Sequence, residues 1–156
     1  MDTKEIKKQI IELERKINVK FPDLYVDFLS KINDGDTFEI KNTGICMYSY
    51  SDLEERNETY QVYEFEPKYF MIGQDGDLAF FIFRNNPNNN SIYSNDLGAL
   101  GSVDMKKEAD NIFDFIKLFE WLYINCRMRN NLSVKLTLPN KFGRNGHLVG
   151  WKPHVF

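Results

Sequence analysis

Cysteine, histidine and long hydrophobic runs are scarce in this 156-residue sequence, and each scarcity excludes a class of protein. The two cysteines, Cys46 and Cys126, lie in apolar stretches without the close spacing of a zinc motif. We therefore expect free buried thiols rather than a disulfide scaffold or a metal centre. No stretch has the apolar length of a signal peptide or a membrane-spanning helix, which predicts a cytoplasmic protein that does not contact membranes.

The usual catalytic motifs are also missing, including a phosphate-binding loop, a zinc-protease helix and a nucleophile elbow. Segments 34–36 and 75–77 each place two aspartates around a glycine, but neither continues with the other ligands of a calcium loop, so turns are favoured. Nothing in the sequence places His147 or His154 beside Cys126 as a catalytic base. The sequence thus predicts a protein that is not an enzyme, with no catalytic, cofactor-binding or metal-binding residues.

The sequence contains enough apolar residues to form the core of one folded domain. The composition is 42% hydrophobic, 15% aromatic and 28% charged, which is typical of a globular protein rather than a disordered one. A chain of this length can bury roughly two thirds of its unfolded surface. We expect one domain over residues 1–156, with a core over about 2–126 and a basic extension over 127–156.

Charge is distributed unevenly along the chain. The net charge is −3, yet residues 127–156 carry six of the 20 basic side chains and none of the 23 acidic ones. The body is therefore acidic and the tail basic. This pattern leaves two alternatives open, because the tail can dock on the body of the same molecule or contact an external partner.

Two amphipathic helices are predicted at the N-terminus. Asp2 can cap the first helix, and apolar residues follow at the 4-3-4 spacing of one helical face. Pro22 suits the first position of the second helix, which we expect to end at the left-handed formers of segment 33–36. The apolar positions of the first helix are Ile6, Ile10, Leu13 and Ile17.

Short β-type runs follow and predict an antiparallel meander. The runs 37–40 and 45–50 flank a turn and form a hairpin, and 51–58 predicts one or two exposed helical turns. Further strands are expected at 69–72, 78–84 and 91–94, with an asparagine-rich loop at 85–90.

A long apolar helix should begin at Asp110 or Asn111 and run through Tyr123. Its apolar arc is so wide that we expect much of it to be buried, with the helix packed across the sheet. Segments 132–138 and 148–151 then predict a C-terminal hairpin. The predicted fold class is α+β, with two N-terminal helices, an antiparallel β meander sheet and a late helix packed on the sheet.

Three segments occur in an order that is typical of one known family. They are Phe21-Pro22-Asp23-Leu24-Tyr25-Val26-Asp27-Phe28-Leu29 with Asn33-Asp34-Gly35, then Ile72-Gly73-Gln74-Asp75-Gly76, then Ala109-Asp110-Asn111-Ile112-Phe113-Asp114-Phe115-Ile116. Together they resemble the SMI1/KNR4 family of the SUKH superfamily, over roughly residues 5–118. The resemblance implies a compact α+β scaffold. It also implies a function of protein binding, since many bacterial members are immunity proteins that neutralise polymorphic toxins, often nucleases, by direct contact.

Under that interpretation an acidic surface would attract a basic toxin and cover its active site. The candidate partner surface lies in the acidic segment that follows the first hairpin. The alternative is that these acids are merely solvated, which is common for runs of charge. The candidates are Asp52, Glu54, Glu55, Glu58, Glu64 and Glu66.

The basic tail supports a second functional hypothesis. Segment 141–147 combines cations, an aromatic residue and a Gly-x-x-Gly run, a mixture suited to contacts with nucleic acid phosphates. A plain hairpin turn explains the same asparagines and glycines. The alternative function is therefore a nucleic-acid-associated or scaffold-type regulatory protein, whose candidate basic surface is Lys141, Arg144, His147 and Lys152.

Overall fold

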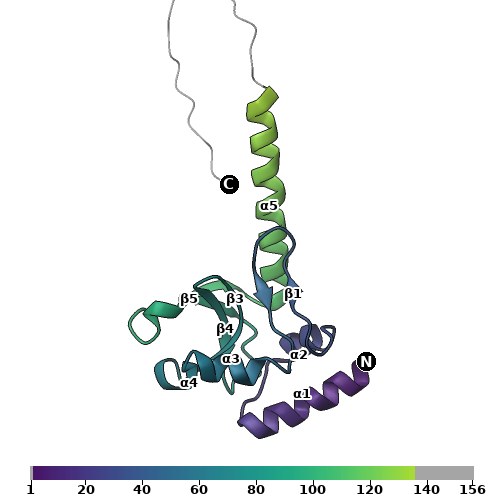
Figure 1. The fold of residues 1–156 in the computed structure, drawn as a ribbon, viewed down its shortest axis with the longest axis vertical. Helices are drawn as coiled ribbons and strands as arrows, with labels where there is room; N and C mark the ends of the chain where they lie inside the picture. The colour runs from purple at the N-terminus through teal and green to yellow at the C-terminus, as the bar shows by residue number, and fades with distance from the viewer. Residues whose placement is uncertain (1, 136–156) are drawn as a thin grey trace, which may run out of the picture.

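The fold is a six-stranded antiparallel sheet with helices packed against it, in a computed structural model that describes residues 2–135 (Figure 1). The strands lie in the sheet in chain order, so each one pairs with the next as a meander. This confirms the predicted α+β class. The strands are β1 (Phe38–Glu39), β2 (Cys46–Met47), β3 (Tyr69–Asp75), β4 (Leu78–Phe83), β5 (Ile92–Asp96) and β6 (Lys106–Ala109). The α-helices are α1 (Thr3–Ile17), α2 (Asp23–Leu29), α3 (Leu53–Thr59), α4 (Val62–Phe65) and α5 (Ile112–Lys135), and a short 3-10 helix, η1, spans Leu97–Ala99.

The two N-terminal helices form as their sequence predicts, apart from the end of α2. The Asp2 side chain caps α1 by accepting from the Lys4 amide. Pro22 lies just before α2 as its N-cap rather than inside its first turn. The predicted end near residue 33 is wrong, and α2 ends at Leu29. The amides of Lys31 and Ile32 donate to carbonyls three residues back rather than four, which tightens the chain into a turn.

Aromatic side chains join the helices to the sheet. Phe21, which precedes α2, lies 5.1 Å from Phe70 of β3 between ring centroids. On the next strand, Phe80 lies 4.9 Å from Phe115 of α5. All four rings are fully buried. Their contacts place α2 and the first turns of α5 over the sheet and account for the aromatic content of the sequence.

The long helix α5 is only partly covered by the body. The Asn111 side chain caps its start by accepting from the amides of Phe113 and Asp114 at 3.0 Å. Its first turns pack on the sheet through Ile112 and Phe115, but beyond Phe119 the helix extends away from the body (Figure 1). The expectation that the late helix packs on the sheet is confirmed for these first turns, whereas Trp121, Leu122 and Ile124 are exposed.

The predicted C-terminal hairpin overlaps α5. Residues 132–135 belong to the helix, so the start of the first expected strand is wrong. A helix that has already formed gains one hydrogen bond for each residue it adds, and this outweighs a short alternating pattern. The rest of the expected hairpin, including 148–151, lies outside the described residues.

Two short elements had no clear signal in the sequence. The four-residue helix α4 lacks an apolar period, and the strand β6 begins with two lysines and a glutamate. Charged residues are common on edge strands because they discourage pairing with a further chain. Here β6 is the last strand of the sheet order, so its charge matches its place at the edge.

Tyr25 offers a test of the helical core. Its side chain is 2% exposed, and its hydroxyl has no hydrogen-bond partner among the described residues. Removing a buried hydroxyl without a partner relieves a desolvation cost. We expect Tyr25→Phe to raise the free energy of unfolding by about 1 kcal/mol in urea denaturation at neutral pH.

Alkaline pH should enlarge this difference. Burial raises the pKa of the Tyr25 hydroxyl, whereas an unfolded tyrosine titrates near pH 10. Titration of Tyr25 therefore leaves the free energy of unfolding unchanged below about pH 10. Above that pH the unfolded tyrosine ionises and the folded one does not, so the folded protein loses stability. Tyr25→Phe should lose less stability between pH 7 and pH ~10.5 than the unchanged protein. Tyr60→Phe serves as a half-buried control, and parallel losses in the unchanged protein and Tyr25→Phe would contradict the prediction.

Candidate partner-binding face

The predicted acidic residues lie on one continuous stretch formed by α3, α4 and their flanking residues, and we call residues 52–66 the acidic face. It contains six acidic side chains and one basic side chain, Arg56. In Figure 1, α3 and α4 lie together along one end of the body. The structure therefore places the six candidates in one region of the surface, although their surroundings differ.

Buried residues hold the acidic face on the sheet. Leu53 and Val62 point inward and are fully buried. Asn57 is also fully buried, and its side chain binds both backbone groups of Met71 in β3. The Asn57 amide nitrogen donates to the Met71 carbonyl at 2.9 Å, and the Asn57 oxygen accepts from the Met71 amide at 2.8 Å. The same nitrogen donates to the Leu53 carbonyl at 2.8 Å, which ties the helix to the strand.

Three of the six acids are engaged within the protein. The Ser49 hydroxyl donates to the Asp52 carboxylate at 2.8 Å. Lys16 of α1 forms an ion pair with Glu54 at 2.5 Å. Glu66 accepts a hydrogen bond from the Gly101 amide at 2.9 Å. These three carboxylates therefore help to hold the fold together and are less available to a partner.

The other three acids point into solvent. Glu55, Glu58 and Glu64 are exposed, and none of them forms an ion pair or a side-chain hydrogen bond with a described residue. An exposed carboxylate without an internal partner keeps its full charge for an approaching molecule. Glu55, Glu58 and Glu64 are thus the best-placed candidates for partner contact.

Electrostatic coupling extends from the acidic face to α1. The hydrogen bond from Lys16 to Glu54 raises the pKa of the lysine, and the charges of Glu54 and Glu58 add to the effect. Glu54 and Glu58 also border a shallow hollow with Tyr63 and Arg84. The Arg84 guanidinium lies 4.8 Å from the centre of the Tyr63 ring. At this distance the positive charge is attracted to the electron-rich face of the ring.

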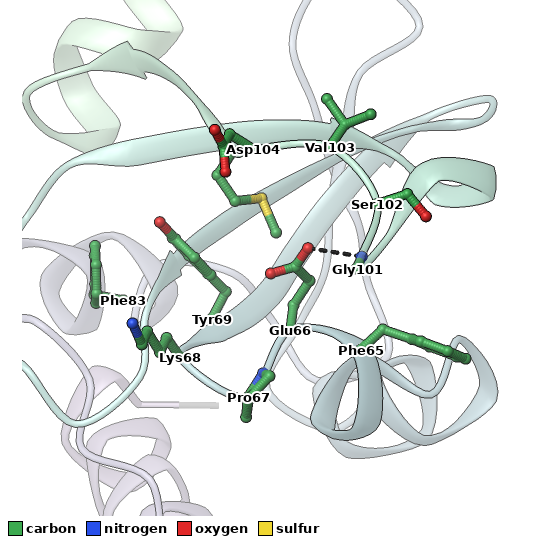
Figure 2. Close-up of a pocket in the computed structure, with 11 residues that line it drawn as sticks. Phe65, Glu66, Pro67, Lys68, Tyr69, Phe83, Gly101, Ser102, Val103 and Asp104 are labelled. Atoms are coloured by element: carbon green, nitrogen blue, oxygen red, sulfur yellow. Dashed lines mark hydrogen bonds between the residues drawn. The ribbon is translucent and has the colours of Figure 1, made fainter.

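A second hollow, of about 430 Å³, opens at the other side of the acidic face (Figure 2). Figure 2 shows Glu66 reaching across it to the backbone nitrogen of Gly101. Phe65 and Val103 border the hollow and are 43% and 58% exposed. Exposed apolar side chains beside carboxylates can contact a partner that carries both apolar and basic groups.

The loop between β5 and β6 forms one wall of this hollow. It is held by the Glu66 contact and by the Asn95 side chain, which donates to the Val103 carbonyl at 2.9 Å. The predictions from sequence included Glu66 but missed this loop. The apolar residues Phe65 and Val103, each flanked by polar residues, are the only local signal of the hollow.

Several predicted features lie outside the part of the chain that is described. They include both histidines and the alternative basic surface of Lys141, Arg144, His147 and Lys152. Within residues 2–135, no group of three or more His, Cys, Asp or Glu side chains is arranged to hold a metal ion. Likewise, none of the described helices is long and apolar enough to cross a membrane.

The three signature segments all have structural roles. In the first, Phe21 and Tyr25 fill the core and Gly35 adopts a positive φ of 74°. The second contains the end of β3 and the turn to β4, and the third caps α5 through Asn111. The signature therefore marks a scaffold, an α+β domain with a helix-covered meander sheet.

Comparison with protein families agrees with this class. The model of the SMI1 / KNR4 family (SUKH-1) matches residues 7–118, and the chain belongs to this family. The match includes the whole acidic face and ends in α5, near the point where the helix leaves the body. A search of curated proteins found no match.

Proposed function

We propose that this chain is an immunity protein, which acts by binding rather than by catalysis and neutralises a basic toxin in a bacterial cytoplasm. The observation that carries the proposal is the acidic face, on which Glu55, Glu58 and Glu64 are exposed and form no ion pair with a described residue. Such a surface speeds association with a positively charged partner. A toxin that acts on nucleic acid has a basic active-site surface and fits this requirement.

The neighbouring hollow supplies the apolar part of the interface. Charges at the rim of an interface mainly set the association rate, while buried apolar anchors set the lifetime of the complex. Phe65 and Val103 stand beside the acidic face and are free to contact an apolar side chain of the toxin. The proposed interface thus combines electrostatic attraction with a local apolar contact.

Charge reversal tests this proposal. The variant Glu55→Lys, Glu58→Lys, Glu64→Lys should weaken binding to a basic toxin that co-purifies with this chain by about a hundredfold, mainly through a slower association rate. Binding is measured by surface plasmon resonance at two salt concentrations, and protection by growth of cells that express the toxin. Glu54 is left unchanged because its reversal would also break the pair with Lys16.

A second triple variant controls for net charge. Asp36, Glu39 and Asp77 are exposed and lie outside the acidic face, so Asp36→Lys, Glu39→Lys, Asp77→Lys changes the total charge by the same amount. The control should bind within about threefold of the unchanged protein, because distant exposed charges are largely screened by salt. Equal losses in both variants would remove the acidic face as the interface. If no toxin co-purifies with this chain and is inhibited by it, the immunity function itself is overturned.

A further inference from the structure

Aromatic rings form part of the lining of the 430 Å³ hollow beside the acidic face. Tyr69 of β3 and Phe83 of β4 both line it, and their ring centroids lie 4.7 Å apart. Tyr93 of β5 packs edge-on against the two rings, at 5.3 Å and 5.4 Å. All three side chains are half-buried, so their mutual contacts hold the rings in place while part of their surface stays open. A ring face held in this way attracts a cation.

Two carboxylates border the same hollow and have no ionic partner among the described residues. One oxygen of Glu66 accepts from the Gly101 amide at 2.9 Å, and its other oxygen forms no hydrogen bond with a described residue. Asp104 is exposed and forms no ion pair within the described part of the chain. Both carboxylates therefore keep hydrogen-bonding capacity and charge for a partner.

The negative charge of the hollow is concentrated at Tyr69. Burial raises the pKa of the Tyr69 hydroxyl, and the neighbouring tyrosine and the two carboxylates raise it further. Figure 2 shows Glu66 and Tyr69 extending from one side of the hollow toward Asp104 on the other. Lys68 is the one cation among the lining residues, and it is exposed and pairs with neither carboxylate. The lining thus carries a net negative charge beside an aromatic face.

This combination of groups is suited to an arginine side chain. Two carboxylates are too few for a calcium ion, which takes about six to eight oxygen ligands. A guanidinium group is planar, stacks on an aromatic ring and donates to carboxylates on more than one side. The ammonium group of lysine is more strongly hydrated and cannot stack in this way. The volume lies toward the small end of the range for ligand pockets, which fits one side chain.

We propose that this hollow receives an arginine side chain of the toxin, an assignment that rests on the proposed function. The guanidinium stacks on Tyr69, and its N–H groups donate to Glu66 and Asp104. Phe65 and Val103 border the hollow and contact the apolar stem of the same arginine. The arginine anchors the complex and sets its lifetime, whereas the exposed acids of the acidic face set its rate of formation.

Neutralising both carboxylates tests the anchor in the complex. Glu66→Gln, Asp104→Asn preserves side-chain size and keeps an oxygen that can accept from the Gly101 amide. In surface plasmon resonance, the co-purifying toxin should dissociate at least about tenfold faster from this variant, with its association rate changed by less than about threefold. The matched control is Glu39→Gln, Asp77→Asn, which neutralises two exposed acids outside the acidic face. It should leave both rates within about twofold of those of the unchanged protein.

A model ligand tests the hollow without the toxin. Nα-acetyl-arginine amide should bind the full chain with a millimolar dissociation constant and shift the backbone amide NMR signals of residues 65–69 and 101–105. Nα-acetyl-lysine amide should bind at least about threefold more weakly, because it cannot stack on the ring. The shifts should be lost in the variant with both carboxylates neutralised and kept in the matched control, and the remaining NMR signals verify that both stay folded.

The two experiments separate this assignment from the immunity function. Equal binding of the arginine and lysine ligands, or no shift in either segment, would overturn the arginine assignment. An unchanged dissociation rate after neutralisation of both carboxylates would also overturn it, while a toxin that is still bound and inhibited would leave the immunity function standing. If no toxin co-purifies with the chain, the immunity function fails, and the NMR titration still decides whether the hollow binds a guanidinium group.

Discussion

Replacing Asn57 with alanine should lower the free energy of unfolding by about 3 kcal/mol, although the residue lies in a helix otherwise rich in exposed charge. The substitution removes three side-chain hydrogen bonds in a fully buried site. It leaves the amide and the carbonyl of Met71 without the partner that satisfied them. A buried polar group that loses its partner costs about 1–3 kcal/mol, so two such groups produce a large effect.

Glu58→Ala is the natural control, since it alters the next residue of the same helix. Glu58 is exposed, and its removal should change stability by less than about 0.5 kcal/mol. The free energies of unfolding of both variants are measured by denaturant titration and fitted with one common m-value. If the Asn57 variant lay within 1 kcal/mol of the control, the hydrogen bonds to Met71 would not be what attaches α3 to the sheet.

Gly73→Ala is the second substitution with a large expected effect. Gly73 of β3 pairs with Met47 of β2, and a Cβ atom at this position would lie 2.6 Å from the Cys46 carbonyl oxygen. It would also lie 2.7 Å from the Met47 sulfur and 3.1 Å from the Met47 Cα. Because two of these three atoms are backbone, the strands must separate to admit a methyl group. We expect a loss of about 3 kcal/mol in thermal or urea unfolding.

Gly76, in the turn after the same strand, provides the comparison. Its φ is +57°, yet a Cβ there would meet no atom within 4 Å. Gly76→Ala should therefore cost only the conformational strain of a left-handed residue, about 1 kcal/mol. The prediction fails if Gly73→Ala is no more destabilising than Gly76→Ala. In that case the close contacts at position 73 would cost no more free energy of unfolding than the left-handed backbone at position 76.

Most of the architecture could be predicted from local patterns. The 4-3 spacing of Ile6, Ile10 and Leu13 indicates α1, and the short apolar runs indicate the meander, because both patterns reflect burial on one face. The prediction failed where burial and local pattern diverge. β6 has two lysines at the sheet edge, and the apolar residues Trp121, Leu122 and Ile124 of α5 are exposed.

The candidate site was predictable as a group of residues but not in its internal differences. The six acids are adjacent in sequence, so their shared region followed from the chain. Which of these acids have partners within the protein could not be predicted from the sequence. Lys16 and Glu54, for example, are 38 residues apart and meet only through the packing of α1 beside α3. The role of Asn57 was equally hidden, since a polar residue among charges gives no local sign that it binds a strand.

The attachment of α3 through Asn57 has a consequence for how this scaffold can diverge. The helix is held on the sheet by the buried side chains of Leu53 and Asn57. By contrast, the exposed acids at positions 55, 58 and 64 form no ion pair or side-chain hydrogen bond with a described residue. Substitutions at those three positions should be nearly neutral for folding and yet change the surface that a partner meets. A gene encoding this domain can therefore acquire a new binding preference by single-codon steps, each of which leaves a folded protein for the next step to act on.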